Sequence, residues 1–284
     1  QTSFAVPMNK VDRPLISVIM GVRYRRSDLS LLQRSIDSMM NQTYSNFEFL
    51  ICENGSTDEA KNCLKEYFQK DIRFKQISGS GAETLAEKLD RCLCAAQGEY
   101  IARMDDDDWS EPNRLQKQIS ALQHHDEKAF VGCNANLIRD GSPAGQRIFP
   151  EFPTVKDFLF VQPYLHPALL FRKEALDVVG GYCEEKRCDG CEDYDLLLRM
   201  YQAGYEGFNL QELLLTYTLP SAGASKPYRY RWYEAWTRYV RFYNLGMLPG
   251  AFPYGIKPLA VGLLPNSLLQ KLKDLREKRR SRSA

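Results

Sequence analysis

The stretch Met104-Asp105-Asp106-Asp107-Asp108-Trp109 decides how the rest of this chain is interpreted. It follows Gly98-Glu99-Tyr100-Ile101-Ala102-Arg103, in which a glycine precedes a short apolar segment typical of a buried strand. Open α/β sheets bind their ligands at the carboxyl ends of their strands. The stretch therefore predicts a ligand site at the carboxyl edge of an α/β sheet.

The run of aspartates favours a bound cation. Adjacent carboxylates repel one another, so their pKa values rise unless a positive charge neutralises them. A hard divalent cation binds carboxylate oxygens and is commonly coordinated by substrate phosphates at the same time. In extended backbone Asp105 and Asp107 point to one face and Asp106 and Asp108 to the other, so one pair can hold a metal diphosphate while the other braces the loop. The alternative is a solvated acidic turn before a helix.

A calcium loop of the EF-hand type does not fit this stretch. Such a loop needs a glycine at its sixth position and a glutamate at its twelfth. Counted from Asp105, those positions hold Ser110 and Gln116.

The composition is that of an ordinary globular protein, with 44% hydrophobic and 26% charged residues among 284. A formal net charge of +2 argues against nucleic-acid binding over the whole surface. No apolar run approaches the roughly 18 residues that a membrane span requires, and no N-terminal stretch has the order of a signal peptide. We expect a cytoplasmic protein, with residues 1–10 as a leader or a non-native remnant.

The eight cysteines are expected to be free thiols in a reducing cytosol, because no secretion signal accompanies them. The spacing of Cys183, Cys188 and Cys191 resembles part of an iron–sulfur or zinc site. No fourth ligand follows at a suitable spacing, so the free-thiol interpretation is preferred.

Strands and helices alternate along the first half of the chain. Apolar runs predict strands over residues 15–22, 47–52, 73–77 and 100–104. Apolar residues at helical spacing predict helices over residues 29–40, 56–69, 84–96 and 110–123. A capping box of Ser56 and Glu59 marks the start of the second helix. This alternation predicts a right-handed, doubly wound parallel sheet over about 11–135.

The pattern changes in the second half. Residues 139–153 are rich in Gly and Pro and predict a loop. One helix is predicted to end at Gly180-Gly181, and Glu192-Asp193-Tyr194-Asp195 to open the next. Acidic residues in a first helical turn complement the helix dipole, which gives Glu192 and Asp193 a purely structural interpretation.

With these segments in place, the sequence resembles the family 2 glycosyltransferases of the GT-A fold over about 15–217. The resemblance rests on an ordered set of motifs: Ser17-Val18-Ile19-Met20, Glu53-Asn54-Gly55-Ser56-Thr57-Asp58, the stretch 98–108, His166-Pro167, Gly180-Gly181-Tyr182 and Glu192-Asp193-Tyr194-Asp195-Leu196. It implies an α/β, Rossmann-like, mostly parallel sheet in a GT-A domain over 11–220. Its nucleotide half would span about 11–135 and its acceptor half about 136–220, with a helical C-terminal extension over 221–284.

The resemblance also implies roles for single residues. The family's nucleotide-binding position falls on Glu53 and Asn54, where Glu53 keeps an acceptor for uracil or ribose and Asn54 gives up a charge. The family's DxD motif falls on Asp105 and Asp107. This implies Mn²⁺ or Mg²⁺ as a cofactor held by Asp107 and Asp105, and nucleotide-sugar contacts from Asp105 and Asp106.

The Glu-Asp doublet of the family falls on Glu192-Asp193, which implies that Asp193 is the catalytic base. Displacement of a nucleoside diphosphate builds negative charge on the leaving phosphate, which a divalent metal neutralises. One carboxylate on the opposite face of the sugar takes the proton of the acceptor hydroxyl, so the configuration inverts. Glu192, His166 and Arg103 are candidates for contact with acceptor or phosphate. The alternative for His166 is a packed residue before a proline.

These implications describe a metal-dependent, inverting glycosyltransferase of the hexosyltransferase type. It would move a sugar from a nucleotide sugar, expected to be a UDP-sugar, to a lipid-linked or polysaccharide acceptor in bacterial cell-surface glycan synthesis. A non-catalytic nucleotide-sugar-binding protein is one rival, and the intact doublet counts against it. A sugar nucleotidyltransferase is another, but it usually needs a Gly-rich phosphate loop that residues 21–26 only faintly suggest.

The C-terminal extension is aromatic and then basic. Tyr, Trp and Arg crowd residues 226–243, which suits sugar stacking, a membrane interface or a buried helix face. Leucines within 268–275 mark one face of a predicted helix, and seven basic residues lie within 271–282. Such a segment binds anionic membrane surfaces, and the alternative is a solvated tail. We therefore expect peripheral contact with the inner face of the cell membrane through this tail.

Overall fold

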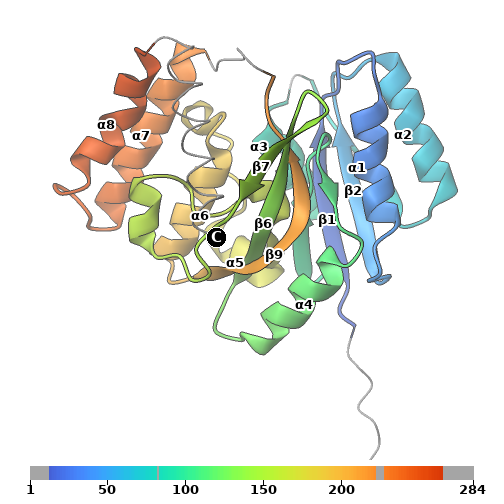
Figure 1. Ribbon diagram of the computed structural model, residues 1–284, viewed down its shortest axis with the longest axis horizontal. Coiled ribbons are helices and arrows are strands. Elements are labelled where there is room, and N and C mark those ends of the chain that lie inside the picture. The colour runs from blue at the N-terminus through green and yellow to red at the C-terminus, as the bar shows by residue number, and fades with distance from the viewer. Residues whose placement is uncertain (1–12, 82, 222–226, 265–284) are drawn as a thin grey trace, which may run out of the picture.

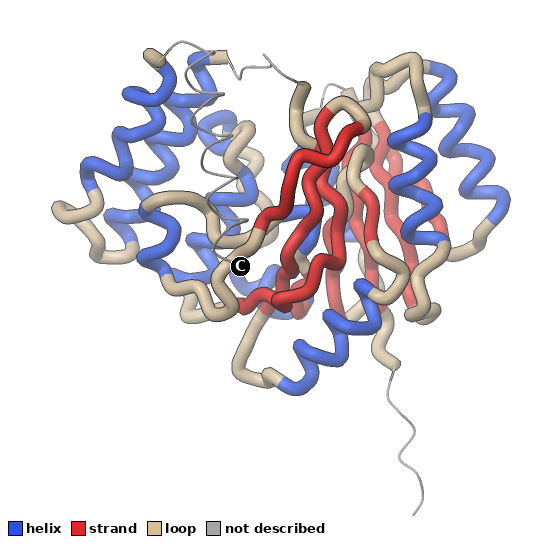
Figure 2. Tube along the Cα trace, in the orientation of Figure 1, coloured by secondary structure: helices blue, strands red, loops and turns tan. Residues whose placement is uncertain are grey.

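The computed structural model describes residues 13–81, 83–221 and 227–264. Its strands are β1 (Ile16–Val22), β2 (Phe47–Glu53), β3 (Phe74–Ser78), β4 (Tyr100–Arg103), β5 (Trp109–Ser110), β6 (Phe130–Arg139), β7 (Ser142–Arg147), β8 (Leu170–Arg172) and β9 (Gly207–Thr218). Its α-helices are α1 (Ser30–Met40), α2 (Asp58–Lys70), α3 (Leu85–Ala95), α4 (Arg114–His124), α5 (Lys173–Val179), α6 (Glu192–Gln202), α7 (Tyr228–Asn244) and α8 (Phe252–Gly262). Within the described residues the strands form one continuous sheet, drawn in red in Figure 2.

The first four strands pair in parallel, as their alternation with helices predicted. Their order is β3-β2-β1-β4, with Ile19 of the central β1 opposite Leu50 of β2 and Arg103 of β4. Strand β1 is a nearly continuous apolar run because both of its faces are buried. The carboxyl ends of these strands meet at one edge, where β2 delivers Glu53 and β4 leads into Asp105.

The sheet continues into the second half of the chain and becomes mixed there. Strand β8 pairs antiparallel with β4, and β6 pairs antiparallel with β8 and parallel with β9. The short strand β5 pairs with the end of β9. The mostly parallel α/β sheet is as predicted, but the doubly wound run of neighbouring parallel strands is confined to β1–β4, and the second half adds one further parallel pair, β6 with β9.

The predicted loop over 139–153 is wrong over the six residues of β7, which form a hairpin with β6. The hairpin turns at Asp140 and Gly141, whose φ angles are 50° and 78°. Two positive φ angles are what a tight hairpin turn requires, and the Asp-Gly pair is its strongest short-range signal.

Side-chain caps mark the starts of α2 and α3. The predicted cap Ser56 is wrong by one residue, because the hydroxyl of Thr57 accepts from Ala60 N at 3.3 Å and caps α2. The Ser56 hydroxyl instead accepts from Tyr24 N at 2.9 Å, which ties the segment after β2 to the segment after β1. At α3 the hydroxyl of Thr84 and the side chain of Glu87 form a complete capping box.

Helices cover both faces of the sheet (Figure 1). One apolar core includes Leu32 of α1 and Ile119 of α4, together with residues of α2. The opposite core includes Leu89 of α3 and Phe242 of α7, together with residues of α5 and α6. The sheet thus lies between α1, α2 and α4 on one face and α3, α5, α6 and α7 on the other.

Helices α7 and α8 form a pair at the end of the molecule away from α1 and α2 (Figure 1). Ala235 and Phe242 lie on the buried face of α7, whereas Trp232 and Trp236 are exposed, so a buried face accounts for only part of the aromatic segment. In the portion of the chain with assigned structure, no helix has both the length and the apolarity to cross a bilayer. The predicted basic helix around 268–275 lies outside the described residues.

Candidate active site

The acidic stretch lies directly after β4, as predicted, but its backbone is not extended. Asp106 and Asp107 form a turn, so the expected alternation of side chains between two faces is wrong. The Ser35 hydroxyl of α1 donates to Asp105 O at 2.7 Å. From β9, Thr218 N donates to Asp108 Oδ1 at 2.7 Å and the Thr218 hydroxyl donates to Asp107 O. Hydrogen bonds from helix α1 and from strand β9 therefore hold the turn in place.

Burial and mutual repulsion hold protons on this turn. Burial raises the pKa of Asp106 to about 7, and the charges of Asp107 and Asp105 add to the effect. Burial and Asp105 likewise raise the pKa of Asp107 to about 6. The pKa of Asp108 rises well above its usual range, first because the side chain is buried. A cluster that holds protons near neutral pH is one that a cation can stabilise.

Two arginines supply the protein's own counter-charge. The guanidinium of Arg103 is fully buried and donates to Asp105 Oδ1, while its Nε and Nη1 have no hydrogen-bond partner in the described structure. Arg26, which is half exposed, places Nη2 3.3 Å from Asp107 Oδ2. Arg103 thus lies beneath the turn, and its burial does not support direct contact with a substrate. Arg26 was not predicted, because one arginine of a basic loop gives no signal of its own.

Asp105 and Asp107 fit a hard divalent cation. Each side chain keeps 29% of its surface exposed, so their oxygens are accessible beside the turn. Mg²⁺ is commonly bound through one or two carboxylates plus substrate phosphates and water. The described residues do not bring a third acidic, His or Cys ligand to these two. The pair therefore suits a metal whose coordination the substrate diphosphate completes.

The predicted nucleotide-binding pair lies at the end of β2. Glu53 Oε1 accepts from Ser56 N at 2.9 Å, and the Asn54 side chain donates to Gly81 O and, at 3.3 Å, to Glu83 Oε2. Asn54 thus ties the tip of β2 to the segment before α3. One carboxylate oxygen of Glu53 holds the turn, which leaves the other without a hydrogen bond from this turn.

Lys88 of α3 is a buried cation at this edge that the sequence interpretation missed. Its Nζ donates to Val22 O at 2.8 Å, at the end of β1, and to Asn54 O at 3.0 Å, just after β2. Burial lowers the pKa of the Lys88 amine. The only signal in the sequence was a lysine on the apolar face of a helix, which a simple amphipathic pattern does not assign.

Asp193 lies in the first turn of α6, at the carboxylate position that the resemblance implies. Its Oδ2 accepts from Gln162 Nε2 at 2.9 Å and its Oδ1 accepts from Tyr194 N at 2.8 Å. The side chain is half-buried, and Glu192 precedes it in the same turn. Gln162 was not predicted, since it comes from an irregular segment without a motif.

His166 is buried and lies beside Tyr182, with Nε2 2.9 Å from the tyrosine hydroxyl oxygen. Burial lowers its pKa to about 3, and the nearby charge of Arg103 acts in the same direction. The imidazole is therefore neutral at physiological pH. This environment favours the packed-residue alternative for His166 over contact with a phosphate.

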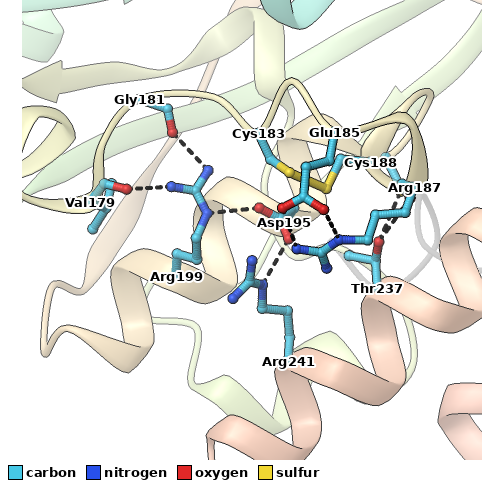
Figure 3. The surroundings of a disulfide bond; sticks show 11 residues. Val179, Gly181, Cys183, Glu185, Arg187, Cys188, Asp195, Arg199, Thr237 and Arg241 are labelled. Atoms are coloured by element: carbon cyan, nitrogen blue, oxygen red, sulfur yellow. Dashed lines mark hydrogen bonds and ion pairs between the residues drawn. A yellow bond between two sulfur atoms is a disulfide. The ribbon is translucent and has the colours of Figure 1, made fainter.

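Asp195 belongs to the framework beneath the site. It is fully buried, and its two oxygens accept from Arg199 Nε and Arg241 Nε, each at 2.7 Å (Figure 3). Arg199 also donates to the carbonyl of Val179, the last residue of α5, and to that of Gly181 just beyond the helix. The network joins α5, α6 and α7 and holds the α6 terminus that carries Asp193.

The prediction of free thiols is wrong at Cys183 and Cys188, which form a disulfide five residues apart (Figure 3). Among the described residues, one group of three side chains has its possible metal-ligand atoms close together: these two sulfurs and a carboxylate oxygen of Asp195. The sulfurs are bonded to each other and Asp195 is paired with two arginines, so this cluster does not fit a metal ion. Cys191 lies apart, with Sγ 3.5 Å from Thr237 Oγ1.

Comparison with known proteins identifies the family of the chain. The family described as Glycosyl transferase family 2 matches residues 17–179. The putative glycosyltransferase EpsE of Bacillus subtilis is 32% identical over 260 residues, which cover 91% of this chain and 92% of that protein. The O-antigen biosynthesis glycosyltransferase WbnJ of Escherichia coli is 34% identical over 218 residues, 75% of this chain and 82% of that one.

Solved structures show the same fold. Staphylococcus aureus TarS 1-349 in complex with UDP-GlcNAc superposes with a TM-score of 0.66 at 16% identity, over 87% of this chain and 72% of that one. The mannosyltransferase PcManGT from Pyrobaculum calidifontis, in complex with GDP-Man and Mn²⁺, has a TM-score of 0.62 at 16% identity, over 95% and 84%. The chain therefore belongs to the family 2 glycosyltransferases and is an enzyme of the GT-A fold.

Proposed function

We propose that this enzyme transfers a sugar, with inversion, from a UDP-sugar to a hydroxyl of a lipid-linked or polysaccharide acceptor. The acidic turn after β4 carries the proposal, because Asp105 and Asp107 present accessible carboxylates beside a cluster that holds protons near neutral pH. UDP-GlcNAc in TarS and the O-antigen role of WbnJ support the donor and acceptor classes. The choice of uridine rests on the UDP-GlcNAc complex of TarS, and the second oxygen of Glu53 is left to accept from the base or the ribose.

Asp105 and Asp107 would hold Mn²⁺ or Mg²⁺, which when bound neutralises the charge that grows on the leaving diphosphate. Asp106 follows Asp105 in the same turn and is proposed to contact the nucleotide sugar. Arg26 lies at the exposed side of the turn, beside Asp107, where its guanidinium can donate to a phosphate oxygen.

Asp193 is the proposed catalytic base. The acceptor hydroxyl oxygen forms a bond to the anomeric carbon, the bond from that carbon to the diphosphate oxygen breaks, and the hydroxyl proton passes to the Asp193 carboxylate. Gln162 donates to one oxygen of Asp193 and so orients the carboxylate. Glu192, next to it in α6, is the proposed contact for a neighbouring acceptor hydroxyl.

A panel of nucleotide sugars, each incubated with the full chain in Mn²⁺ and in EDTA, tests the proposal. We expect metal-dependent release of UDP from one UDP-sugar and slower release or none from GDP- and ADP-sugars. Release of GDP alone would correct the base. Tight binding of a nucleotide sugar without turnover, in the presence of extracts that contain glycan acceptors, would favour the non-catalytic rival, and release of pyrophosphate from sugar phosphate and UTP would favour the nucleotidyltransferase.

A lipid-linked acceptor places the enzyme at a membrane surface, and the seven basic residues of 271–282 support peripheral contact there. Charged side chains near an anionic leaflet contribute about 1 kcal/mol each at low salt. This contact would lie on the inner face of the cell membrane.

A further inference from the structure

Helix α7 exposes an aromatic stripe on one face. Trp232, Trp236, Tyr239 and Tyr243 are 58%, 55%, 41% and 68% exposed. Their spacing of four, three and four residues places them on the same side of the helix. The opposite side of α7 packs against the core that includes α3, α5 and α6, where Phe242 is buried. The aromatic stripe therefore faces outward in the folded chain.

Helix α8 widens this stripe into a surface. Its exposed apolar residues are Phe252, Ile256 and, just after the helix, Leu263 and Leu264. A Cβ placed on Gly255 would lie 3.8 Å from Tyr239 Cα, and one on Gly262 would lie 2.7 Å from the Tyr228 ring. These approaches show that α7 and α8 pack antiparallel and in close contact (Figure 1). The two stripes therefore adjoin, and we call these exposed residues of α7 and α8 the aromatic surface.

The two helices that form the aromatic surface carry mainly basic charges. Among the exposed residues of the two helices none is acidic, and Arg229 is basic. The one acidic residue of α7, Glu234, is partly exposed but pairs with Arg231 and Arg238, and α8 contains no acidic residue. The sequence beyond the last described residue, 265–284, holds seven basic and two acidic residues.

We propose that the aromatic surface binds the interfacial layer of an anionic lipid bilayer. Exposed apolar patches of this kind mark interaction sites, and Trp and Tyr rings are enriched where a membrane meets water. Because the two helices carry only one acidic residue, and that residue is paired with arginines, repulsion by anionic headgroups is limited. A second copy of the chain is a poorer occupant, because a two-fold contact would place the mainly basic α7 of one copy against the mainly basic α7 of the other. The inference deepens the proposed function only in that a lipid-linked acceptor would lie in the same membrane.

The test compares the full chain with the double variant Trp232→Gln/Trp236→Gln. The matched control is Ile72→Gln, since Ile72 is 93% exposed and lies between α2 and β3, outside the aromatic surface. Partition into phosphatidylcholine vesicles with phosphatidylglycerol should fall on the order of tenfold in the double variant, because two interfacial side chains lose their apolar contact. The control should bind like the native chain. Native tryptophan emission should also shift to shorter wavelength on these vesicles, and the shift should vanish in the double variant.

Equal partition of the double variant and the control, with thermal unfolding unchanged, would overturn the inference. So would a dimer, detected by light scattering, that the double variant dissociates while native vesicle binding stays at background. The assay contains no nucleotide sugar, so its outcome is independent of transfer. Vesicle binding without sugar release would count against the proposed function alone.

Discussion

Arg103 and Asp105 form an ion pair in which the arginine is fully buried and the aspartate is partly exposed. Two of the three guanidinium nitrogens lack a hydrogen-bond partner in the described structure. A buried charge is costly unless it is paired, so this arginine and the acidic turn stabilise each other. The pair also reduces the charge of the turn before any metal or substrate binds.

Replacing Arg103 with Met should destabilise the metal-free protein by about 3–5 kcal/mol, because Asp105 loses its buried partner. Urea unfolding followed by circular dichroism measures the change. Arg26→Met is the matched control: its ion pair with Asp107 is half exposed, and such pairs contribute less than about 1 kcal/mol. Equal unfolding midpoints for the two variants would show that the buried Arg103 pair stabilises the protein no more than the exposed Arg26 pair does.

Asp90 should make stability depend on pH. Its Oδ1 accepts from Tyr182 N at 2.8 Å, and burial raises its pKa to about 6, with Glu184 acting in the same direction and Arg199 against it. The folded state therefore favours the protonated acid, and its advantage is lost as pH rises from about 4, the unfolded value, through about 6.

Asn at position 90 keeps the acceptor oxygen and removes the charge. Asp90→Asn should be more stable than the native protein at pH 8, on the order of 1–2 kcal/mol, and no more stable at pH 4. Denaturant unfolding at the two pH values checks this. Asp177→Asn, at an exposed aspartate of α5, should show no such pH-dependent gain, and a gain at both pH values for Asp90→Asn would refute the titration.

UDP should bind measurably only with Mn²⁺ or Mg²⁺, because the acidic turn otherwise repels the diphosphate. Calorimetry in Mn²⁺ and in EDTA measures the difference. Asp107→Asn should weaken binding at least tenfold in Mn²⁺, the scale of losing one charge-assisted metal contact, whereas Asp58→Asn on the surface of α2 should not. Equal affinity in EDTA would show that the acidic turn has no part in metal-dependent UDP binding.

Asp193→Asn should leave donor binding nearly unchanged and lower turnover roughly 10²-fold or more, the scale of losing a general base. Asp195→Asn is the informative comparison, two positions along the same helix. It breaks buried pairs with Arg199 and Arg241, so it should lower stability by about 3–5 kcal/mol, whereas Asp193→Asn should unfold like the native protein. Full turnover in Asp193→Asn would move the base to Glu192.

The disulfide predicts a pattern of thiol labelling. Without reductant, iodoacetamide should modify the exposed Cys94 and leave Cys183 and Cys188 unmodified. After reduction of the unfolded chain all three should react. Peptide mass spectrometry reads the pattern, and labelling of Cys183 in the unfolded, unreduced chain would show that the two cysteines are free thiols.

The sequence was most informative where one physical cause dominates. Burial on both faces makes β1 a continuous apolar run, and the glycine and apolar residues before Asp105 identify β4. Helix ends such as Gly180, which has a φ of 75°, follow from local backbone preference. These features predicted the nucleotide half and the place of the acidic turn.

What the sequence did not reveal depends on contacts between distant segments. The pairing of β6 with β9 and the two bonds from Thr218 to the acidic turn join residues about eighty or more positions apart. Gln162 and Lys88 carry no motif, and their partners become visible only in the folded chain. Asp195 resembles Asp193 in sequence but is distinguished from it by two arginines.

The bonds from Thr218 and Ser35 to the acidic turn bear on the order of events after synthesis. Protein groups on β9 and α1 already hold the turn, so its shape does not wait for an inorganic ion. The nascent chain can complete this turn in a cell starved of manganese, and the proposed ion would bind afterwards. Replacement of manganese by magnesium would then depend on which ion is available in the cell and would not require the turn to refold.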